Sequence, residues 1–151
     1  MELFRITSKN EKETRQLGII FARAFLRMTS KKALVIGLMG DLGSGKTTFM
    51  KGFARGAGIT GHIQSPTFVL AKPYTMRKRG NYRTLYHIDA YRLHHAKDMY
   101  VLGWEEWAKH PKNIIVVEWA DTIKSILPKH RFEIHFQHAG IHKRKLIFYI
   151  F

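Results

Sequence analysis

The 151-residue chain has no cysteine, only 4 prolines, and 11 acidic residues against 26 lysines and arginines. The absence of cysteine excludes a disulfide framework and a thiolate zinc site, and it fits a reducing compartment. No apolar stretch approaches the roughly 20 residues that a membrane-spanning helix needs. The segment 1–9 also lacks the apolar core of a secretory signal. We therefore expect a cytoplasmic protein that does not engage a membrane.

The shortage of acidic residues is most pronounced in one part of the chain. The formal net charge is +15, and no aspartate or glutamate occurs between Asp41 and Asp89. That interval contains the basic residues Lys46, Lys51, Arg55, Lys72, Arg77, Lys78, Arg79 and Arg83. Such a surface attracts polyanions over long range, so it favours RNA or an acidic protein as a partner. A solvated basic surface without a partner is the alternative interpretation.

One segment carries a nucleotide-binding signature. Residues 40–48 read GDLGSGKTT, which fits the pattern G-x-x-x-x-G-K-[ST]. The glycines allow positive φ angles and a close approach of backbone N–H groups to a polyphosphate. In this pattern Lys46 supplies charge to the β- and γ-phosphates, and Thr47 is placed to ligate Mg²⁺. The predicted nucleotide-binding residues of the loop are Asp41, Leu42, Gly43, Ser44, Gly45, Lys46, Thr47 and Thr48.

The flanking sequence agrees with a phosphate-binding loop. The apolar run 33–39 is typical of a buried strand, and the segment 47–57 is a good helix that ends near a glycine. Strand, glycine-rich loop and helix is the order that such a site requires, because the helix directs its positive dipole end at the phosphates. With 45% hydrophobic residues, the chain suffices for one core, so we expect one α/β domain over residues 1–151.

The remaining segments predict a mixed, mostly parallel sheet with helices on both faces and antiparallel hairpins. An edge strand is expected at 3–6, and a helix follows it from a capping-box pattern at Ser8 and Glu11. Its apolar positions are Leu17, Ile20, Phe21, Ala24 and Phe25. Further along we expect a hairpin of 68–71 with 82–89, a helix at 96–109, a buried strand at 113–119, a helical turn at 121–127, and a hairpin of 131–137 with 145–151.

Three further places carry polar groups that suit a Mg²⁺–nucleotide site. The turn Ser65-Pro66-Thr67 presents hydroxyls after the first helix of the motif, where they can sense a γ-phosphate, or it is an ordinary turn. Asp89 ends a strand, where it can complete the Mg²⁺ shell or cap the next segment. Glu118 ends the strand 113–119, where it can orient water or the metal's water shell, or pair with a nearby cation. His135, His138 and His142 are expected on the surface rather than in a metal site.

Taken together, these motifs resemble the TsaE (YjeE) family, small bacterial ATPases of tRNA threonylcarbamoyladenosine biosynthesis. The resemblance runs in order over most of the chain. The residues that carry it are GDLGSGKTT at 40–48, SPTF at 65–68, HIDAYRL at 87–93, Leu102-Gly103 before Glu105-Glu106, Val117-Glu118-Trp119 and Leu127-Pro128. The sequence departs from the family at Ala90, where leucine is common, and at Ala120, where proline is common. Neither position supplies a chemical group.

The resemblance implies a set of roles that the individual motifs leave open. It implies that Lys46 and Thr47 bind phosphate and Mg²⁺, that Ser65 to Thr67 form a switch-like loop with Thr67 near the nucleotide, and that Trp119 lies close to it. It also implies that Asp89 and Glu118 are the two acids at the metal and the attacking water. The cofactors would be ATP and Mg²⁺. The protein partners would be TsaB and TsaD, and tRNA would be reached through their complex.

Other functions remain open from the residues alone. A small-molecule kinase also uses a phosphate loop with two acids, although the chain shows no arginine-rich lid. A GTP switch is disfavoured because the guanine-reading N-K-x-D segment is absent. A nucleic-acid-binding module with a vestigial nucleotide site would explain the charge but not the intact Lys46-Thr47 pair. A direct tRNA contact near Arg77 to Arg79 is a separate hypothesis.

Overall fold

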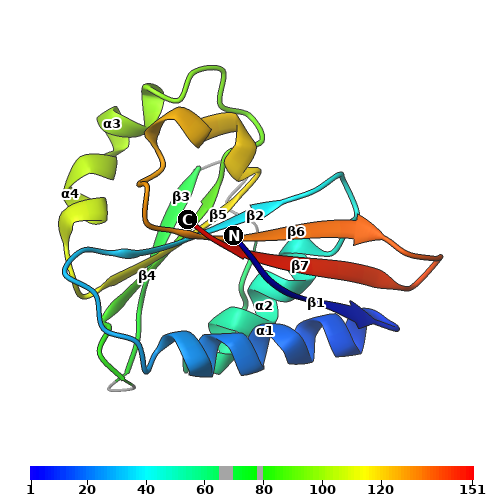
Figure 1. Cartoon of the computed structure of the whole chain (residues 1–151). Helices are drawn as coiled ribbons and strands as arrows, with labels where there is room; N and C mark the ends of the chain where they lie inside the picture. The colour runs from blue at the N-terminus through cyan, green and yellow to red at the C-terminus, as the bar shows by residue number, and fades with distance from the viewer. Residues whose placement is uncertain (65–69, 78–79) are drawn as a thin grey trace.

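The strand β2 (Leu34–Met39) lies at the centre of the sheet, and every one of its residues is buried. This is the expected behaviour of an unbroken apolar run, which needs cover on both faces. The structure is a computed structural model that describes residues 1–64, 70–77 and 80–151 (Figure 1). Within them, seven strands form one mixed sheet in the order β1-β7-β6-β2-β5-β4-β3. The other strands are β1 (Glu2–Ser8), β3 (Ala71–Thr75), β4 (Thr84–Asp89), β5 (Asn113–Glu118), β6 (Phe132–His138) and β7 (Arg144–Ile150).

The sheet is parallel at its centre and antiparallel at both edges. β2 pairs in parallel with β5 and β6, and β4 pairs in parallel with β5. The outer pairs β1–β7, β6–β7 and β3–β4 are antiparallel. This arrangement confirms the predicted mixed α/β sheet, its C-terminal hairpin and its N-terminal edge strand. The other predicted hairpin is present as β3 with β4, but β3 spans Ala71–Thr75 instead of 68–71, of which 68 and 69 lie outside the described residues. It also brings the C-terminal ends of β2, β4 and β5 to one edge, where open α/β sheets bind ligands.

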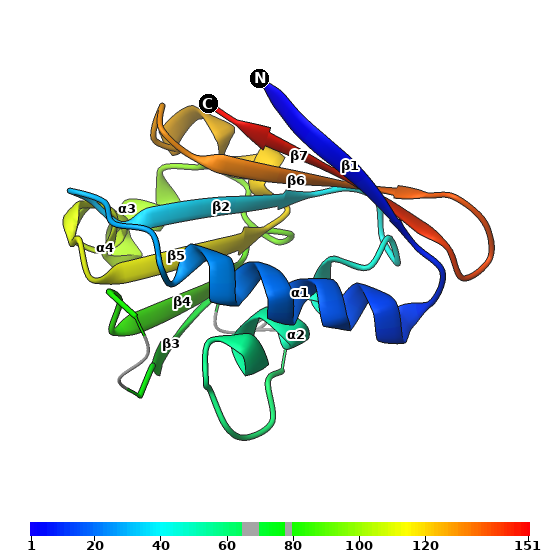
Figure 2. The same cartoon turned by 60° about the horizontal axis from the view of Figure 1, so that its bottom comes forward.

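Helices cover both faces of the sheet, as predicted. Figures 1 and 2 show α1 (Glu11–Phe25) and α2 (Lys46–Gly56) together on one face. The helices α3 (Asp98–Leu102) and α4 (Trp104–Lys109) and the 3₁₀ helix η1 (Ala120–Ile126) cover the other. Alternate side chains of the strands therefore enter two separate apolar cores. No helix in these described ranges is both long enough and apolar enough to traverse a bilayer.

The helices α1 and α2 pack in backbone contact because glycines line their interface. A Cβ atom at Gly52 would lie 2.0 Å from the Arg15 carbonyl oxygen, and one at Gly18 would lie 2.2 Å from the Phe49 carbonyl oxygen. A side chain larger than hydrogen therefore cannot be placed at either position without moving a backbone. This contact fixes α2, and with it the glycine-rich loop before it, against α1.

The start of α1 differs from the predicted capping box at Ser8 and Glu11. The helix begins two residues later than that pattern implies, and Asn10 is its N-cap, accepting a hydrogen bond from the Glu13 N–H at 2.9 Å. The Glu13 carboxylate in turn accepts the Lys9 N–H at 2.7 Å. Ser8 instead ends β1 and places its hydroxyl 2.7 Å from that of Thr14 in the interior. Because Ser8 pairs with β7 as the last residue of β1, it does not cap the helix, and Asn10 is the N-cap of α1 instead.

Two further sequence predictions need correction. The predicted helix at 96–109 is two short helices, because Gly103 has φ 107° and stands between them in a left-handed conformation. On α1, Ile20 is half exposed and Ala24 is exposed, whereas the predicted apolar residues Leu17 and Phe21 are partly buried and Phe25 is buried. The other buried residues of the helix are Thr14, Gly18 and Ala22.

Candidate functional site

The glycine-rich loop connects the C-terminal end of β2 to the start of α2, as the motif predicts. Gly40 has φ 143°, and a Cβ atom there would lie 2.5 Å from the Phe136 carbonyl oxygen, so only glycine fits. Gly45 has φ 104° and is the N-cap of α2, which therefore begins at Lys46 without a side-chain cap. The first N–H groups of α2 are consequently available to an anion.

This loop forms the floor of a cavity of about 530 Å³. Its lining brings together the loop and side chains that lie far apart in the sequence. The lining residues are Glu11, Thr14, Leu42, Gly43, Ser44, Gly45, Lys46, Thr47, Thr48, Asp89, Tyr91, Glu118, Trp119, His142 and Arg144. The volume suits a small-molecule ligand. Asp41 does not line it, but its backbone carbonyl contributes to the loop as described next.

The Lys46 side chain is folded back onto its own loop. Its Nζ atom donates hydrogen bonds to the carbonyl oxygens of Gly40 at 2.6 Å and Asp41 at 2.8 Å, and it lies 3.4 Å from the Ser44 hydroxyl. The same ammonium lies 3.9 Å from the centroid of the Trp119 ring. The lysine is 4% exposed. It is thus a buried cation held by neutral oxygens and an aromatic face, at the end of the cavity formed by the glycine-rich loop.

Burial lowers the pKa of Lys46 from its ordinary value of 10.5, because a low-dielectric site disfavours the charged ammonium. The carboxylates of Glu118, Asp121, Asp41 and Asp89 act in the opposite direction and favour the charged form. Desolvation is the larger effect. The site therefore gains from an additional anion close to Lys46, such as a phosphate.

Thr47 and Glu118 are joined directly. The Thr47 hydroxyl donates to Glu118 Oε2 at 2.7 Å, so the first residue after the lysine lies against the acid at the end of β5. The other carboxylate oxygen, Glu118 Oε1, is 2.8 Å from His87 Nε2. Glu118 is 1% exposed and His87 is 0% exposed. The carboxylate is thus held on both oxygens inside the protein.

Asp89 lies next to Glu118 on the adjoining strand, since the two are direct partners in the parallel register of β4 and β5. Asp89 is 6% exposed, and its Oδ1 atom accepts the Tyr91 N–H at 3.0 Å. Thr47, Asp89 and Glu118 therefore gather hard oxygen donors at one edge of the cavity. Mg²⁺ prefers oxygen ligands and is usually bound by one or two carboxylates together with substrate phosphates, so these residues fit that metal.

Trp119 follows Glu118 directly and has a left-handed backbone conformation, with φ 57° and ψ 43°. For a bulky residue this is an uncommon conformation that the surrounding structure has to maintain. It turns the indole over Lys46, and the Tyr91 ring lies 4.9 Å from it between centroids. Both aromatic residues line the cavity, as the predicted proximity of Trp119 to the nucleotide requires.

Part of the predicted site lies outside the described residues. Ser65, Pro66 and Thr67, which the sequence assigns to a switch-like loop, fall there, and so do Lys78 and Arg79 of the basic hairpin tip. The predictions made for them remain predictions. Of the histidines expected on the surface, His138 and His142 are exposed and His135 is 36% exposed in its side chain; His142 also lines the cavity.

The sequence reasoning missed residues that reach the cavity from two distant elements. Glu11 and Thr14 come from the first turns of α1, His142 comes from the turn between β6 and β7, and Arg144 begins β7. Arg144 donates to the Gly43 carbonyl oxygen at 3.1 Å, so the hairpin holds the loop directly. Only the long-range pairing of β1 with β7 brings these residues together. No local sequence pattern indicates that contact.

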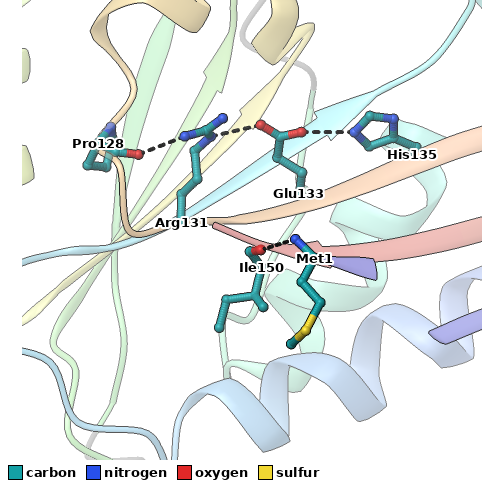
Figure 3. Close-up of polar contacts among 6 residues, drawn as sticks. All are labelled: Met1, Pro128, Arg131, Glu133, His135 and Ile150. Atoms are coloured by element: carbon teal, nitrogen blue, oxygen red, sulfur yellow. Dashed lines mark hydrogen bonds and ion pairs between the residues drawn. The ribbon is translucent and has the colours of Figure 1, made fainter. Parts of the chain in front are cut away.

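A third buried carboxylate, Glu133 on β6, lies outside this cavity (Figure 3). Arg131 Nε donates to its Oε1 atom at 2.7 Å, and His135 Nε2 lies 2.9 Å from its Oε2 atom. Arg131 also donates to the Pro128 carbonyl oxygen at 3.1 Å. Near this group the N-terminal ammonium of Met1 donates to the Ile150 carbonyl oxygen at 2.8 Å. The contacts identify a structural ion pair that anchors the end of the sheet.

A second cavity of about 600 Å³ lies beside the α1–α2 contact. Its described lining residues include four basic or titratable side chains and none that is acidic. These are Arg15 of α1, Lys51 and Arg55 of α2, and His62 of the following loop. We call this the basic groove. The glycine-mediated contact between the helices brings its cations together.

The chain is similar in sequence to one protein family and in structure to a solved protein. The family profile described as "Threonylcarbamoyl adenosine biosynthesis protein TsaE" matches residues 8–146. The tRNA threonylcarbamoyladenosine biosynthesis protein TsaE of Bacillus subtilis strain 168 is 38% identical over 148 residues, which are 98% of this chain and 86% of that protein. The Haemophilus influenzae protein of the same name is 32% identical over 114 residues, covering 76% of this chain and 69% of its own length. The crystal structure of B. subtilis YdiB superposes with a TM-score of 0.75 at 34% identity, over 98% of this chain and 86% of that one.

Proposed function

The chain belongs to the TsaE family of tRNA threonylcarbamoyladenosine biosynthesis proteins, and from this premise we propose that it is the ATP-binding and ATP-hydrolysing subunit of that machinery. One observation carries the proposal. Lys46, Thr47, Asp89 and Glu118 share a single cavity at the C-terminal edge of the parallel strands. This combination of a phosphate-binding loop with two acids is what Mg²⁺-dependent phosphoryl chemistry uses.

Each of these residues has a role that its position supports. The loop N–H groups and Lys46 bind the phosphates, and Lys46 exchanges the carbonyls of Gly40 and Asp41 for phosphate oxygens. Thr47 and Asp89 ligate the metal, either directly or through water. Glu118 lies beside both and orients a water molecule or the metal's water shell. Bound Mg²⁺ would neutralise charge on the phosphate oxygens while the γ-phosphoryl group is transferred to water and ADP leaves.

The remaining lining supports nucleotide binding as well. Trp119 and Tyr91 form an aromatic wall beside the loop. Glu11, Thr14 and His142 offer polar groups at the end of the cavity built from α1 and the β6–β7 turn. The adenine base of a nucleotide is flat and has polar edges, so it suits a site with aromatic rings for stacking and polar groups for hydrogen bonds. The cofactors of this proposal are ATP and Mg²⁺.

We further propose that the protein acts as a nucleotide-driven switch on a complex of TsaB and TsaD. In that complex the threonylcarbamoyl group is placed on the adenosine 3′ of the tRNA anticodon, and this chain does not perform that transfer. Residues 1–151 would act as one P-loop ATPase domain in the cytoplasm, with low activity alone and stimulation by its partners. The resemblance described above is the basis for these partners.

The test is ATP hydrolysis by the purified protein, alone and with TsaB, TsaD and tRNA, for the wild type and Lys46→Ala. Weak activity that rises with the partners and disappears in the variant supports the proposal. Partner-independent phosphorylation of a small acceptor would favour a kinase instead. Absence of hydrolysis under every condition would indicate a vestigial nucleotide site.

We also propose that the chain itself contacts the tRNA of the complex. The family acts in tRNA modification, and the basic groove offers Lys51, Arg55 and also Arg15, which pairs with Glu11 of its own helix at 3.0 Å; none of the described lining residues is acidic. Within the described ranges neither Lys51 nor Arg55 forms an ion pair. Unpaired cations in a groove suit the phosphates of an RNA backbone. The tip near Arg77 is the second candidate for such a contact.

A further inference from the structure

His87 contacts the site from behind the acids. It lies on β4, two residues before Asp89, so both side chains project from the same face of the sheet. Glu118 projects from that face as well, on the neighbouring strand β5. His87 does not line the cavity and is completely buried. Among the described residues, its one polar contact is with Glu118 Oε1 at 2.8 Å.

The contact between His87 and Glu118 indicates which nitrogen of the imidazole carries the proton. An ionised carboxylate only accepts hydrogen bonds, so His87 Nε2 carries the proton and donates it to Glu118. The other ring nitrogen, Nδ1, is buried and has no hydrogen-bond partner in the described parts of the chain. A buried N–H without a partner is costlier and rarer than an unused acceptor, so Nδ1 is the unprotonated nitrogen. The structure thus favours the Nε2–H tautomer.

The second oxygen of Glu118 is fixed from the opposite side. Thr47 donates to Oε2 at 2.7 Å, so the carboxylate is held between a strand and the first turn of α2. Thr47 is a proposed metal ligand and has to be able to turn its hydroxyl oxygen to Mg²⁺. When it does so, His87 is the remaining hydrogen-bond donor that keeps the carboxylate in place. A ligand or base whose orientation is fixed by a buried donor performs better than a free one.

We propose that His87 is a positioning residue that sets the orientation of the Glu118 carboxylate for Mg²⁺-dependent ATP hydrolysis. The inference rests on the proposed ATPase function. It assigns His87 no contact with the nucleotide or with the attacking water. Its effect passes entirely through Glu118, and this distinguishes it from the acids and from Lys46.

A matched pair of amide variants tests the idea. The side-chain nitrogen of glutamine reaches the position of His87 Nε2, whereas that of asparagine reaches only the position of Nδ1. We expect His87→Gln to keep kcat within about threefold of the wild type, and His87→Asn to lower kcat by about 10- to 100-fold, as loss of such outer partners commonly does. KM for ATP should be unchanged in both, because the phosphate loop is intact. Equal kcat values for the two variants overturn the proposal.

A double-mutant cycle separates positioning from a general structural role. In the Glu118→Gln background, His87→Asn should produce no further loss of kcat, because the group that it positions is already changed. An additional loss of the same size in that background would show that His87 acts independently of Glu118. A fall in Tm with unchanged kcat and unchanged Mg²⁺ dependence would show a structural role alone.

Two measurements remain informative if the asparagine variant does not fold or if the ATPase proposal itself fails. Long-range ¹H–¹⁵N NMR of the wild type should show His87 with its proton on Nε2, and a proton on Nδ1 alone would contradict the geometry. The Tm increase caused by ATP should depend on Mg²⁺ in the wild type and in His87→Gln. If the wild type hydrolyses no ATP while the NMR result holds, the proposed function fails and the placement of His87 stands.

Discussion

The Lys46 ammonium lies 3.9 Å from the centroid of the Trp119 ring, and it donates to two carbonyl oxygens of its own loop. The contact joins the phosphate-binding loop after β2 to the residue that follows β5. Trp119 holds its ring there with a backbone conformation of φ 57°. The Lys46 ammonium is therefore bound by the protein's own groups, and a ligand has to replace these contacts to bind it. ATP binding and the pH dependence of stability should both depend on this arrangement.

Replacing Lys46 by alanine should abolish ATP binding or nearly so. The variant removes a charged hydrogen-bond donor aimed at the phosphates, and the expected loss of affinity is about 100-fold or more. Isothermal titration with ATP and Mg²⁺ measures it. Lys51→Ala is the matched control, since this lysine lies on the same helix but is exposed and outside the nucleotide cavity. Comparable ATP affinity in both variants would remove Lys46 from the site.

Stability should respond to pH through Lys46 in a defined direction. Burial lowers the pKa of Lys46 below 10.5, so between that lowered pKa and 10.5 the unfolded state binds more protons than the folded state. The free energy of unfolding of the wild type should therefore rise with pH in this window, relative to that of Lys46→Met. Urea unfolding of both proteins at several alkaline pH values measures the difference. A difference that stays constant or falls would show that Lys46 is not desolvated.

The two acids should affect hydrolysis more than folding. We expect Asp89→Ala and Glu118→Gln to lower Mg²⁺-dependent ATP hydrolysis by at least about 100-fold, because each removes a carboxylate beside the metal position. Glutamine is chosen at 118 because alanine would leave the buried donors of Thr47 and His87 unpaired. Hydrolysis is measured in the complete complex, with circular dichroism as the check on folding. Normal rates in both folded variants would show that the acids are wrongly assigned.

The α1–α2 contact should be intolerant of a single methyl group. Gly52→Ala would place a Cβ atom 2.0 Å from the Arg15 carbonyl oxygen, so one helix has to shift. We expect a loss of about 3 kcal/mol, which is typical of severe overpacking, and a fall in Tm of about 6 to 12 °C. Lys51→Ala, the exposed neighbour, should change stability by no more than about 0.5 kcal/mol. Calorimetry showing equal Tm values would mean that the helices are not in backbone contact.

The basic groove should contribute to tRNA binding by the complex. Neutralising Arg15, Lys51 and Arg55 to glutamine should weaken binding and reduce the salt dependence of the affinity, by roughly one unit of slope for each lost phosphate contact. Fluorescence anisotropy with labelled tRNA across salt concentrations gives both quantities. Alanine at residues 77 to 79 tests the hairpin tip in the same way.

The control for this experiment removes the same number of charges elsewhere. Lys97, Lys124 and Lys129 are exposed and outside the basic groove, so their change to glutamine lowers the net charge without touching it. An equal effect in this control would show that total charge, and no particular surface, attracts the tRNA. Unchanged binding in all three variants would leave the proteins of the complex as the tRNA-contacting partners.

Local chemistry determined much of this protein from its sequence. The run of apolar residues at 33–39 predicted a buried strand, and the glycines with Lys46 and Thr47 predicted a loop that begins a helix. Alternation predicted the final hairpin, and an acid at each strand end predicted the edge at which the site lies. These features were predictable because each depends on residues that are neighbours in the chain.

Only the tertiary structure determined the contacts between segments that are distant in the sequence. The register of β4 against β5 places Asp89 beside Glu118 and brings His87 within 2.8 Å of the same carboxylate. Pairing of β1 with β7 placed Ser8 in a strand instead of at the predicted helix cap, and pairing of β2 with β6 and of β6 with β7 brought Arg144 to the loop. Gly103 divided a helix that periodicity had predicted to be continuous. Such outcomes depend on which strands pair and how closely two helices approach, and no window of sequence contains both partners.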